Sequence, residues 1–120
     1  MFFNPIVDAN VRARIARLQS ADVDAAGVGS ALDELRDAFM PSYPRDSIDE
    51  DDGSLAVLWG LVAKIFLRTS DAGHRENAAS LLTYLLIYAD THSISVDRRA
   101  LKQWVAANAQ SPLAAYFEEL

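Results

Sequence analysis

The sequence predicts an all-α protein: a single-domain antiparallel helical bundle of about five helices plus a short C-terminal helix. Apolar residues recur at spacings of three and four along almost the whole chain, and the strict alternation typical of strands is nearly absent. The composition is 51% hydrophobic and 23% charged, which excludes a disordered chain. A length of 120 residues is that of one ordinary domain, so we expect residues 1–120 to form a single unit.

Two helices are expected in the first third of the chain. The first covers residues 4–19, with Asn4 as its N-cap and Pro5 at its first helical position. The second begins at residue 22 or 24 and ends at residue 39, because Pro41 cannot continue it. Its expected buried face consists of Val28, Leu32, Leu35 and Phe39.

The middle of the chain predicts an acidic loop and two buried helices. The loop covers about residues 40–53 and is interrupted by two prolines. Ser54 is expected to cap a third helix over residues 55–68, and Ser70 or Asp71 opens a fourth helix that ends near residue 91. Both helices are apolar around most of their circumference, as is typical of the middle of a bundle. Their short connection predicts that they pack antiparallel.

The last part of the chain predicts one amphipathic helix and one short helix. Ser95 is expected to cap a fifth helix that ends near residue 109. Its inward residues are Leu101, Trp104 and Val105. Ser111 and Pro112 begin the short final helix, which is expected to reach residue 120.

The residues that usually support catalysis or metal binding are few. The chain has no cysteine, which excludes disulfides, thiolate nucleophiles and zinc sites with cysteine ligands. Its two histidines, His74 and His92, have no second histidine at i+3 or i+4, and we expect both at the surface near helix ends. An EF-hand register that uses Gly53 places Ile48 and Trp59 where carboxylates are required. We therefore expect no catalytic residue, no metal, no cofactor and no enzyme activity.

The location of the protein follows from what its sequence does not contain. No apolar run approaches the roughly 20 residues that cross a bilayer. The first ten residues lack the basic start and apolar stretch of a secretory signal. Together with the absence of cysteine, these features predict a cytoplasmic protein without a membrane partner.

The negative charge is concentrated in one third of the chain. The formal net charge is −6. Residues 21–53 contain ten acids and two arginines, whereas residues 1–20 have a net charge of +2 and residues 54–120 have none. On a helical projection Asp33, Glu34 and Asp37 lie opposite the buried stripe of the second helix, so we expect them to form one anionic surface with the loop. Self-repulsion on such a surface opposes folding, which favours a role in binding.

The predicted site combines this acidic surface with one aromatic residue. Tyr43 lies between two prolines, and a stiffened aromatic side chain suits the centre of an interface because it loses little entropy on binding. The expected partner-binding residues are Asp33, Glu34, Asp37, Tyr43, Asp46, Asp49, Glu50, Asp51 and Asp52. Acidic segments also serve solubility alone, and that alternative remains open at this point.

The function predicted from these features is that of an acidic protein-binding module for a basic protein. Small, acidic, cysteine-free helical proteins are in physical character similar to bacterial immunity proteins and antitoxins, which neutralise a basic nuclease toxin by direct binding. The alternative is a helical adaptor or regulatory domain that recognises another protein through helix packing. A nucleic-acid-binding regulator that uses Arg98, Arg99 and Lys102 ranks lower, because a chain with a pI near 4.7 repels phosphates.

Overall fold

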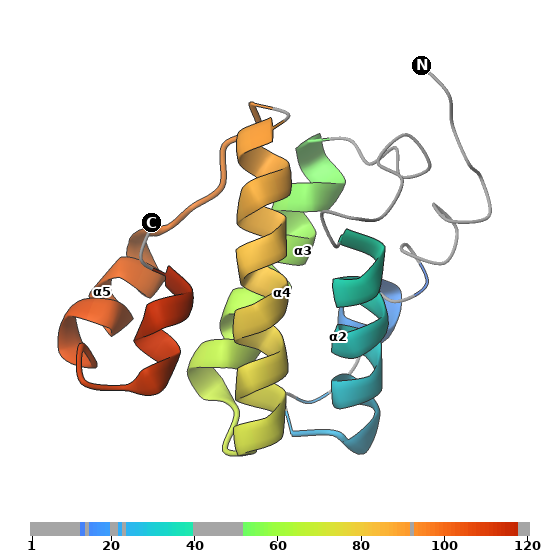
Figure 1. The fold of residues 1–120 in the computed structure, drawn as a ribbon. Helices are drawn as coiled ribbons and strands as arrows, with labels where there is room; N and C mark the ends of the chain where they lie inside the picture. Colours follow the sequence, from blue (N-terminus) through green and yellow to red (C-terminus); the bar gives the residue numbers. More distant parts are fainter. Residues whose placement is uncertain are drawn as a thin grey trace.

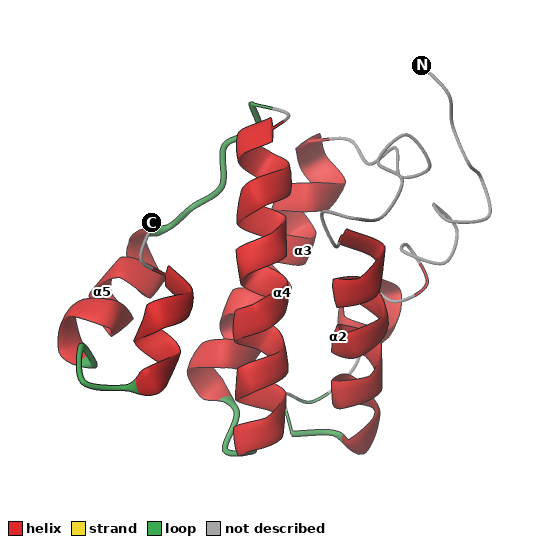
Figure 2. Cartoon of the chain, in the orientation of Figure 1, coloured by secondary structure: helices red, strands yellow, loops and turns green. Residues whose placement is uncertain are grey.

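The computed structural model describes residues 13, 15–19, 22, 24–39, 52–91 and 93–117 of the chain. Within these residues the regular structure is entirely helical, with no strand, which confirms the predicted all-α class (Figure 2). The elements are α2 (Ala26–Phe39), α3 (Asp52–Arg68), α4 (Ala72–Thr91), α5 (Arg99–Ala107) and the 3₁₀ helix η2 (Pro112–Phe117). Residues 15–19, which belong to the predicted first helix, are also helical.

Helix α4 forms the centre of the arrangement. Figure 1 shows α2 on one side of α4, α5 and η2 on the other, and α3 packed behind. The chain runs up α2, down α3 and up α4, so α3 is antiparallel to both helices (Figure 1). The antiparallel packing predicted for α3 and α4 is therefore confirmed.

The buried residues explain why α4 is central. Those of α4 lie on most sides of the helix: Ala78, Ala79, Leu81, Leu82, Leu85, Leu86, Tyr88 and Ala89. A helix that is apolar nearly all round must be covered by other helices. The predicted stripe of α2 is also buried, with Val28, Leu32, Leu35 and Phe39 all 1% exposed or less. On α3, which is also predicted to be apolar around most of its circumference, the buried residues include Leu55, Leu58, Trp59, Val62, Ile65 and Phe66.

Aromatic pairs join the helices. Phe39 at the end of α2 meets Tyr88 of α4 edge to face, with ring centroids 5.2 Å apart. Phe66 of α3 contacts Trp104 of α5 at 4.8 Å and Phe117 of η2 at 5.2 Å. Such pairs add to the free energy gained by burying apolar surface, by about 0.5 to 1.5 kcal/mol each. They fix α2 and the α5–η2 segment on opposite sides of the core.

Two of the predicted helix starts are confirmed by hydrogen bonds. The His74 N–H donates to Oδ1 of Asp71 (3.0 Å), so Asp71 caps α4. The Leu113 N–H donates to Oγ of Ser111 (3.2 Å) ahead of η2, which begins at Pro112. In addition, Arg75 of α4 donates to the Phe66 and Thr69 carbonyls, which satisfies the end of α3.

Two other predicted caps are wrong. Helix α3 begins at Asp52, so Ser54 lies inside the helix and the predicted loop loses its last two residues. Helix α5 begins at Arg99, four residues after the predicted cap Ser95, and its N-cap Arg98 makes no side-chain capping bond. The main-chain carbonyl of Asp97 accepts a hydrogen bond from Nε1 of the buried Trp59 (2.7 Å), which holds this segment in a non-helical form.

The remaining differences concern helix ends. Helix α2 begins at Ala26 because the Ala25 N–H donates to the Asp22 carbonyl in a turn that precedes it. The predicted fifth helix ends at Ala107 rather than residue 109, and the final helix is a 3₁₀ turn that ends at Phe117. Residues 1–12, which include the predicted start of the first helix, and residues 40–51 of the predicted loop lie outside the described residues. No described helix has the length and apolar character needed to cross a membrane.

Candidate partner-binding surface

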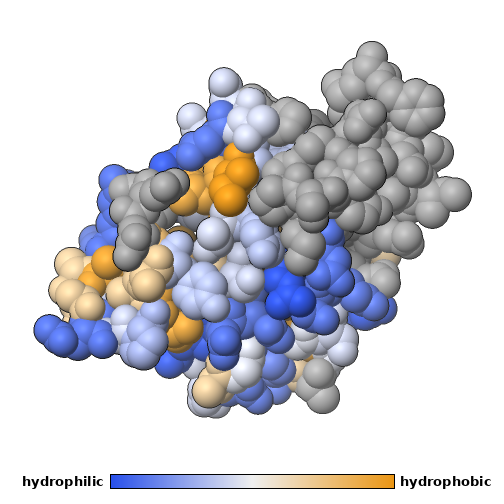
Figure 3. Space-filling model, in the orientation of Figure 1, coloured by the Kyte–Doolittle hydropathy of each residue, from blue (hydrophilic) through white to orange (hydrophobic). Residues whose placement is uncertain are grey.

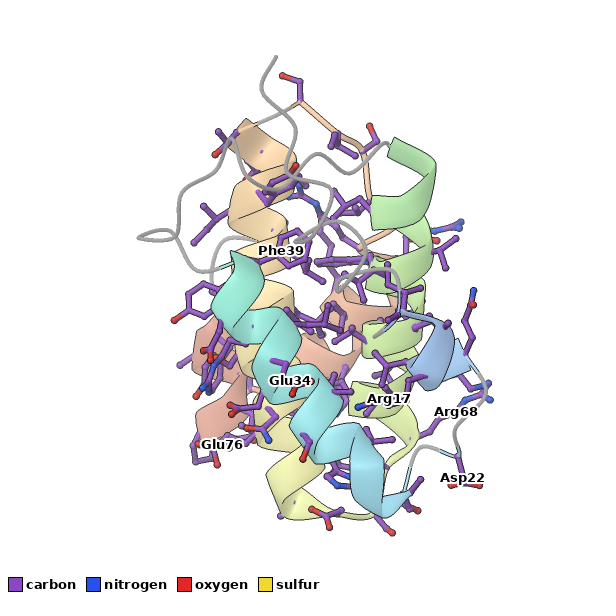
Figure 4. All side chains as sticks on the ribbon, turned by 90° about the vertical axis from the view of Figure 1, so that its right-hand side faces the viewer. Arg17, Asp22, Glu34, Phe39, Arg68 and Glu76 are labelled. Carbon is purple, nitrogen blue, oxygen red and sulfur yellow. The ribbon has the colours of Figure 1, made fainter. Side chains whose placement is uncertain are left out.

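The outer side of α2 presents the three acids predicted for it. Asp33, Glu34 and Asp37 are all exposed, and Figure 4 shows Glu34 on the side of α2 that faces away from the bundle. The opposite side of the same turns is fully buried through Leu32 (0% exposed) and Leu35 (1%). These carboxylates therefore stand on a helix whose backbone is fixed by the core.

Arg36, which is not among the predicted site residues, lies between two of these acids. Its guanidinium lies 2.6 Å from Oδ1 of Asp33 and 3.7 Å from Oδ1 of Asp37. Its Nε is buried without a hydrogen-bond partner, while the side chain as a whole is 29% exposed. The i, i+3 spacing of Asp33 and Arg36 is the signal that predicts this pair. Exposed ion pairs are weak, so Arg36 orients Asp33 more than it stabilises the fold.

The other predicted site residues are only partly located. Asp52 is the first residue of α3. Helix α2 ends and α3 begins at the same end of the molecule in Figure 1. Tyr43, Asp46, Asp49, Glu50 and Asp51 lie outside the described residues. The structure thus brings together Asp33, Glu34 and Asp37, and the predicted merger of this face with the acidic loop stays a prediction.

Asp24, counted among the ten acids, has a structural role instead. Its carboxylate accepts hydrogen bonds from the Thr69 hydroxyl, from the Ser70 N–H (2.9 Å) and from the Ser70 hydroxyl (3.1 Å). The hydrogen bond from Thr69, followed by that from the Ser70 N–H, holds the pKa of Asp24 below its usual value. Asp24 therefore joins the start of α2 to the α3–α4 turn.

One of the two histidines, His74, lies among the described residues. His74 lies in the first turn of α4, as predicted near a helix end, but its side chain is half-buried and its Nδ1 is buried without a partner. It faces α2: a Cβ atom at Gly29 would lie 3.1 Å from His74 Cδ2. His92 is outside the described residues. Within the described ranges no group of three potential metal ligands comes together.

The cationic face predicted on α5 is largely neutralised. Arg98 pairs with Asp90 of α4 (2.9 Å), and Arg99 donates two hydrogen bonds to the carboxylate of Asp97 (3.0 and 2.9 Å). The hydrogen bonds from the side chain and the N–H of Arg99 lower the pKa of Asp97 to about 2. Lys102 is exposed and makes no such pair with a described residue. Two of the three cations are thus compensated, which weakens the nucleic-acid alternative.

Hydrophobic residues reach the surface in other places. In the view of Figure 3 hydrophilic residues cover most of the described surface, and hydrophobic ones appear beside the upper part of α4 and in the region of α5 and η2. The large hydrophobic side chains that are exposed in the described part of the chain are Val57 of α3 (44%) and Ile87 of α4 (37%).

Comparison with protein-family models, with curated proteins and with solved structures found no match for this chain. Its function has therefore to be inferred from the residues on its surface. Among the described residues, the outer face of α2 is where exposed acids gather on a rigid support.

Proposed function

We propose that this chain is a binding module that docks a basic protein through the acidic face of α2, in the manner of a bacterial immunity protein or antitoxin that neutralises a nuclease toxin. The observation that supports this proposal is the exposure of Asp33, Glu34 and Asp37 on turns of α2 whose other side is buried. No cofactor, metal or membrane takes part in this function.

The rigid backbone of α2 matters because binding costs conformational entropy. Side chains on a fixed helix lose less freedom on association than those on a flexible segment. Arg36 adds to this order, because it already restrains Asp33 in the free protein. A partner arginine or lysine can therefore form a desolvated pair with these acids, and truncation of one member of such a pair costs about 2 to 5 kcal/mol.

A nuclease is a suitable partner on physical grounds. It must present cationic groups to the phosphates of RNA or DNA. An acidic protein can cover those groups, and a net charge of −6 steers it toward them before contact. Electrostatic steering raises association to about 10⁸ to 10⁹ M⁻¹s⁻¹, which suits a protein that must act before its toxin does.

A helical adaptor remains the second candidate because of Val57. This side chain is 44% exposed on α3 rather than α2, and an aliphatic side chain on the surface of a helix can pack against a partner helix. Binding through Val57 would depend little on salt, whereas binding through the α2 acids would depend on it steeply.

The experiment is a capture followed by a kinetic comparison. The purified protein is immobilised, its partner is captured from the source cell and identified by mass spectrometry, and the purified partner is then measured by surface plasmon resonance. Under the proposal the partner is basic, and Asp33→Ala, Glu34→Ala or Asp37→Ala accelerates its dissociation at least tenfold.

Glu76→Gln provides the matched control. Glu76 is an exposed acid on α4, so its neutralisation changes the net charge by the same amount while leaving the α2 acids in place. An acidic or neutral partner, or equal effects of Glu76→Gln and the α2 substitutions, would contradict the proposal.

A further inference from the structure

The outward side of α3 forms a stripe that the fold does not use. Val57, Gly60, Lys64 and Arg68 are exposed, and their spacing of three or four residues places them on one side of the helix. We call these four residues the α3 stripe. It is apolar and small in its first half and basic in its second half.

Each part of the α3 stripe departs from what helix stability alone favours. Lys64 and Arg68 lie one turn apart, so they repel each other, and neither side chain makes an ion pair or hydrogen bond with a described residue. The position of Arg68 at the helix end favours a cation, but Lys64 lies a turn earlier. Gly60 has nothing within 4 Å of a Cβ position, so no contact requires a glycine there. Local departures without a compensating contact are expected at a binding surface.

The outer side of α2 also carries small residues followed by charged residues, but here the charge is negative. Its exposed residues are Gly27, Ser30, Asp33, Glu34 and Asp37, which we call the α2 stripe. Small residues come first and acids follow, and Gly27 also has open space at its Cβ position. Both stripes extend over about 15 Å, the length of ten residues of helix.

The two stripes match residue by residue when the helices run in the same direction. Gly27 then lies opposite Val57 and Ser30 opposite Gly60, so small residues allow the helices to approach. In the same register Asp37 lies opposite Arg68, and Asp33 and Glu34 lie opposite Lys64. Opposite charges thus meet along the second half of the contact, and the apolar Val57 is covered in the first half.

We propose that the α3 stripe binds the α2 stripe of a second copy of this chain. Within one molecule α2 and α3 are antiparallel, so this parallel contact forms only between copies (Figure 1). A twofold axis perpendicular to the helices reverses their direction, so it makes α2 of one copy parallel to α3 of the other. The complementary charge of the two stripes and their common register support a second copy of this chain as the binding partner.

This inference shares its acids with the proposed function but does not rest on it. A second copy and a basic partner compete for Asp33, Glu34 and Asp37, so the partner would displace the dimer. The net charge of −6 opposes self-association, and the contact is small, so the dimer is weak, with a Kd between about 1 μM and about 1 mM.

The first test measures the protein alone by sedimentation velocity at low salt. The average mass should rise toward a dimer over this concentration range, and added salt should return it to a monomer. Lys64→Glu should raise the Kd at least tenfold. Lys102→Glu on α5 changes the net charge by the same amount and should have a smaller effect, which separates the local contact from general repulsion.

The second test exchanges the charges between the stripes. The variants Asp33→Lys/Asp37→Lys and Lys64→Glu/Arg68→Glu should each be monomeric, and their equimolar mixture should form a dimer because opposite charges then meet again. Circular dichroism and a thermal melt establish that each variant is folded. If a double variant does not fold, the single substitutions Asp37→Lys and Lys64→Glu replace it in the mixing experiment.

Three results would overturn the inference. These are a monomer at every concentration at low salt, equal effects of Lys64→Glu and Lys102→Glu, and a mixture of folded charge-exchanged variants that stays monomeric. If the protein is monomeric and still loses a basic partner on Asp33→Ala, this inference fails and the proposed function stands.

Discussion

At the residue scale, the glycines of α2 and α3 differ in what surrounds them. Gly60 has open space at its Cβ position, whereas a Cβ at Gly29 would lie 3.1 Å from the His74 ring. Since alanine is a better helix former, Gly60→Ala should raise the free energy of unfolding by about 0.5 to 1 kcal/mol. Gly29→Ala should gain less or lose stability, because the half-buried His74 must move. Urea denaturation of both variants measures the difference, and equal gains would show that the contact with His74 is soft.

A second residue with an unusual conformation ends α4. Ser93 has φ 56°, in the left-handed region that favours glycine. The Ile94 N–H donates to the Ala89 carbonyl (2.8 Å) and the Ser93 N–H to the Asp90 carbonyl (3.4 Å), which is the hydrogen-bond pattern of a Schellman motif. Ile94 is 8% exposed, so the turn also buries an apolar residue.

Ser93→Gly should therefore stabilise the protein. Removal of Cβ relieves a steric cost of about 1 kcal/mol at this φ, partly offset by the greater freedom of glycine in the unfolded chain. The melting temperature by differential scanning calorimetry should rise by about 2 to 5 °C. Ser95→Gly is the control, because Ser95 does not have a positive φ and its replacement should lower stability slightly. A fall in melting temperature for Ser93→Gly would show that the Ser93 side chain has a role of its own.

At the element scale, Asp24 makes the attachment of α2 sensitive to pH. The folded pKa of Asp24 lies below its ordinary value of 3.8, so its contribution to stability is present above that value and is lost as the pH falls through the folded pKa. Asp97, with a folded pKa of about 2, behaves in the same way through its bonds to Arg99. Stability should therefore decline with pH below about 4.

Asp24→Asn tests this attachment. The amide keeps the size of the side chain but accepts less strongly from Thr69 and Ser70, so the variant should be less stable at pH 7. Its remaining stability should depend less on pH in the acidic range. Chemical denaturation at several pH values measures both, and parallel profiles for wild type and variant would show that Asp24 contributes nothing to acid sensitivity.

The same scale shows which helix boundaries can be predicted from sequence. Asp71 and Pro112 mark helix starts because no long-range contact competes with the local signal. Ser95 is a good local cap, but the bond from Trp59 to the Asp97 carbonyl and the Schellman turn keep the chain non-helical to residue 98. The bond between Trp59 and Asp97 joins residues 38 positions apart in the sequence, so no local pattern contains it. The buried stripes were predictable because burial follows helical periodicity.

At the scale of the whole molecule, the number of acids overstates the charge available for binding. Asp24 is engaged by Thr69 and Ser70, and Arg36 lies beside Asp33 and Asp37. The sequence predicted the positions of Asp33, Glu34 and Asp37 from helical phase. The predicted site does not include Arg36, although its i, i+3 spacing from Asp33 indicates an ion pair between the two side chains. Half-buried Arg36 therefore refines the predicted surface without removing it.

The electrostatic field of the molecule should nevertheless control the association rate constant of a basic partner. Between about 0.01 and 0.15 M salt the Debye length falls from about 30 to about 8 Å, so the association rate constant should fall by about tenfold or more. Dissociation should change much less. Stopped-flow measurements at low protein concentration, where self-association is absent, test this. The variant Asp33→Ala/Asp37→Ala should show a shallower salt dependence, and an association rate that is indifferent to salt would favour the adaptor.

The bond between Trp59 and the Asp97 carbonyl also gives the molecule a built-in optical signal. The chain has two tryptophans. Trp59 is buried against the segment that leads to α5, and Trp104 lies within the ring cluster that joins α5 and η2 to α3. Both indoles thus monitor the attachment of the C-terminal segment, and neither belongs to α2. Release of α5 and η2 should shift the emission maximum to longer wavelength, while a ligand seated on α2 alone should leave the spectrum unchanged.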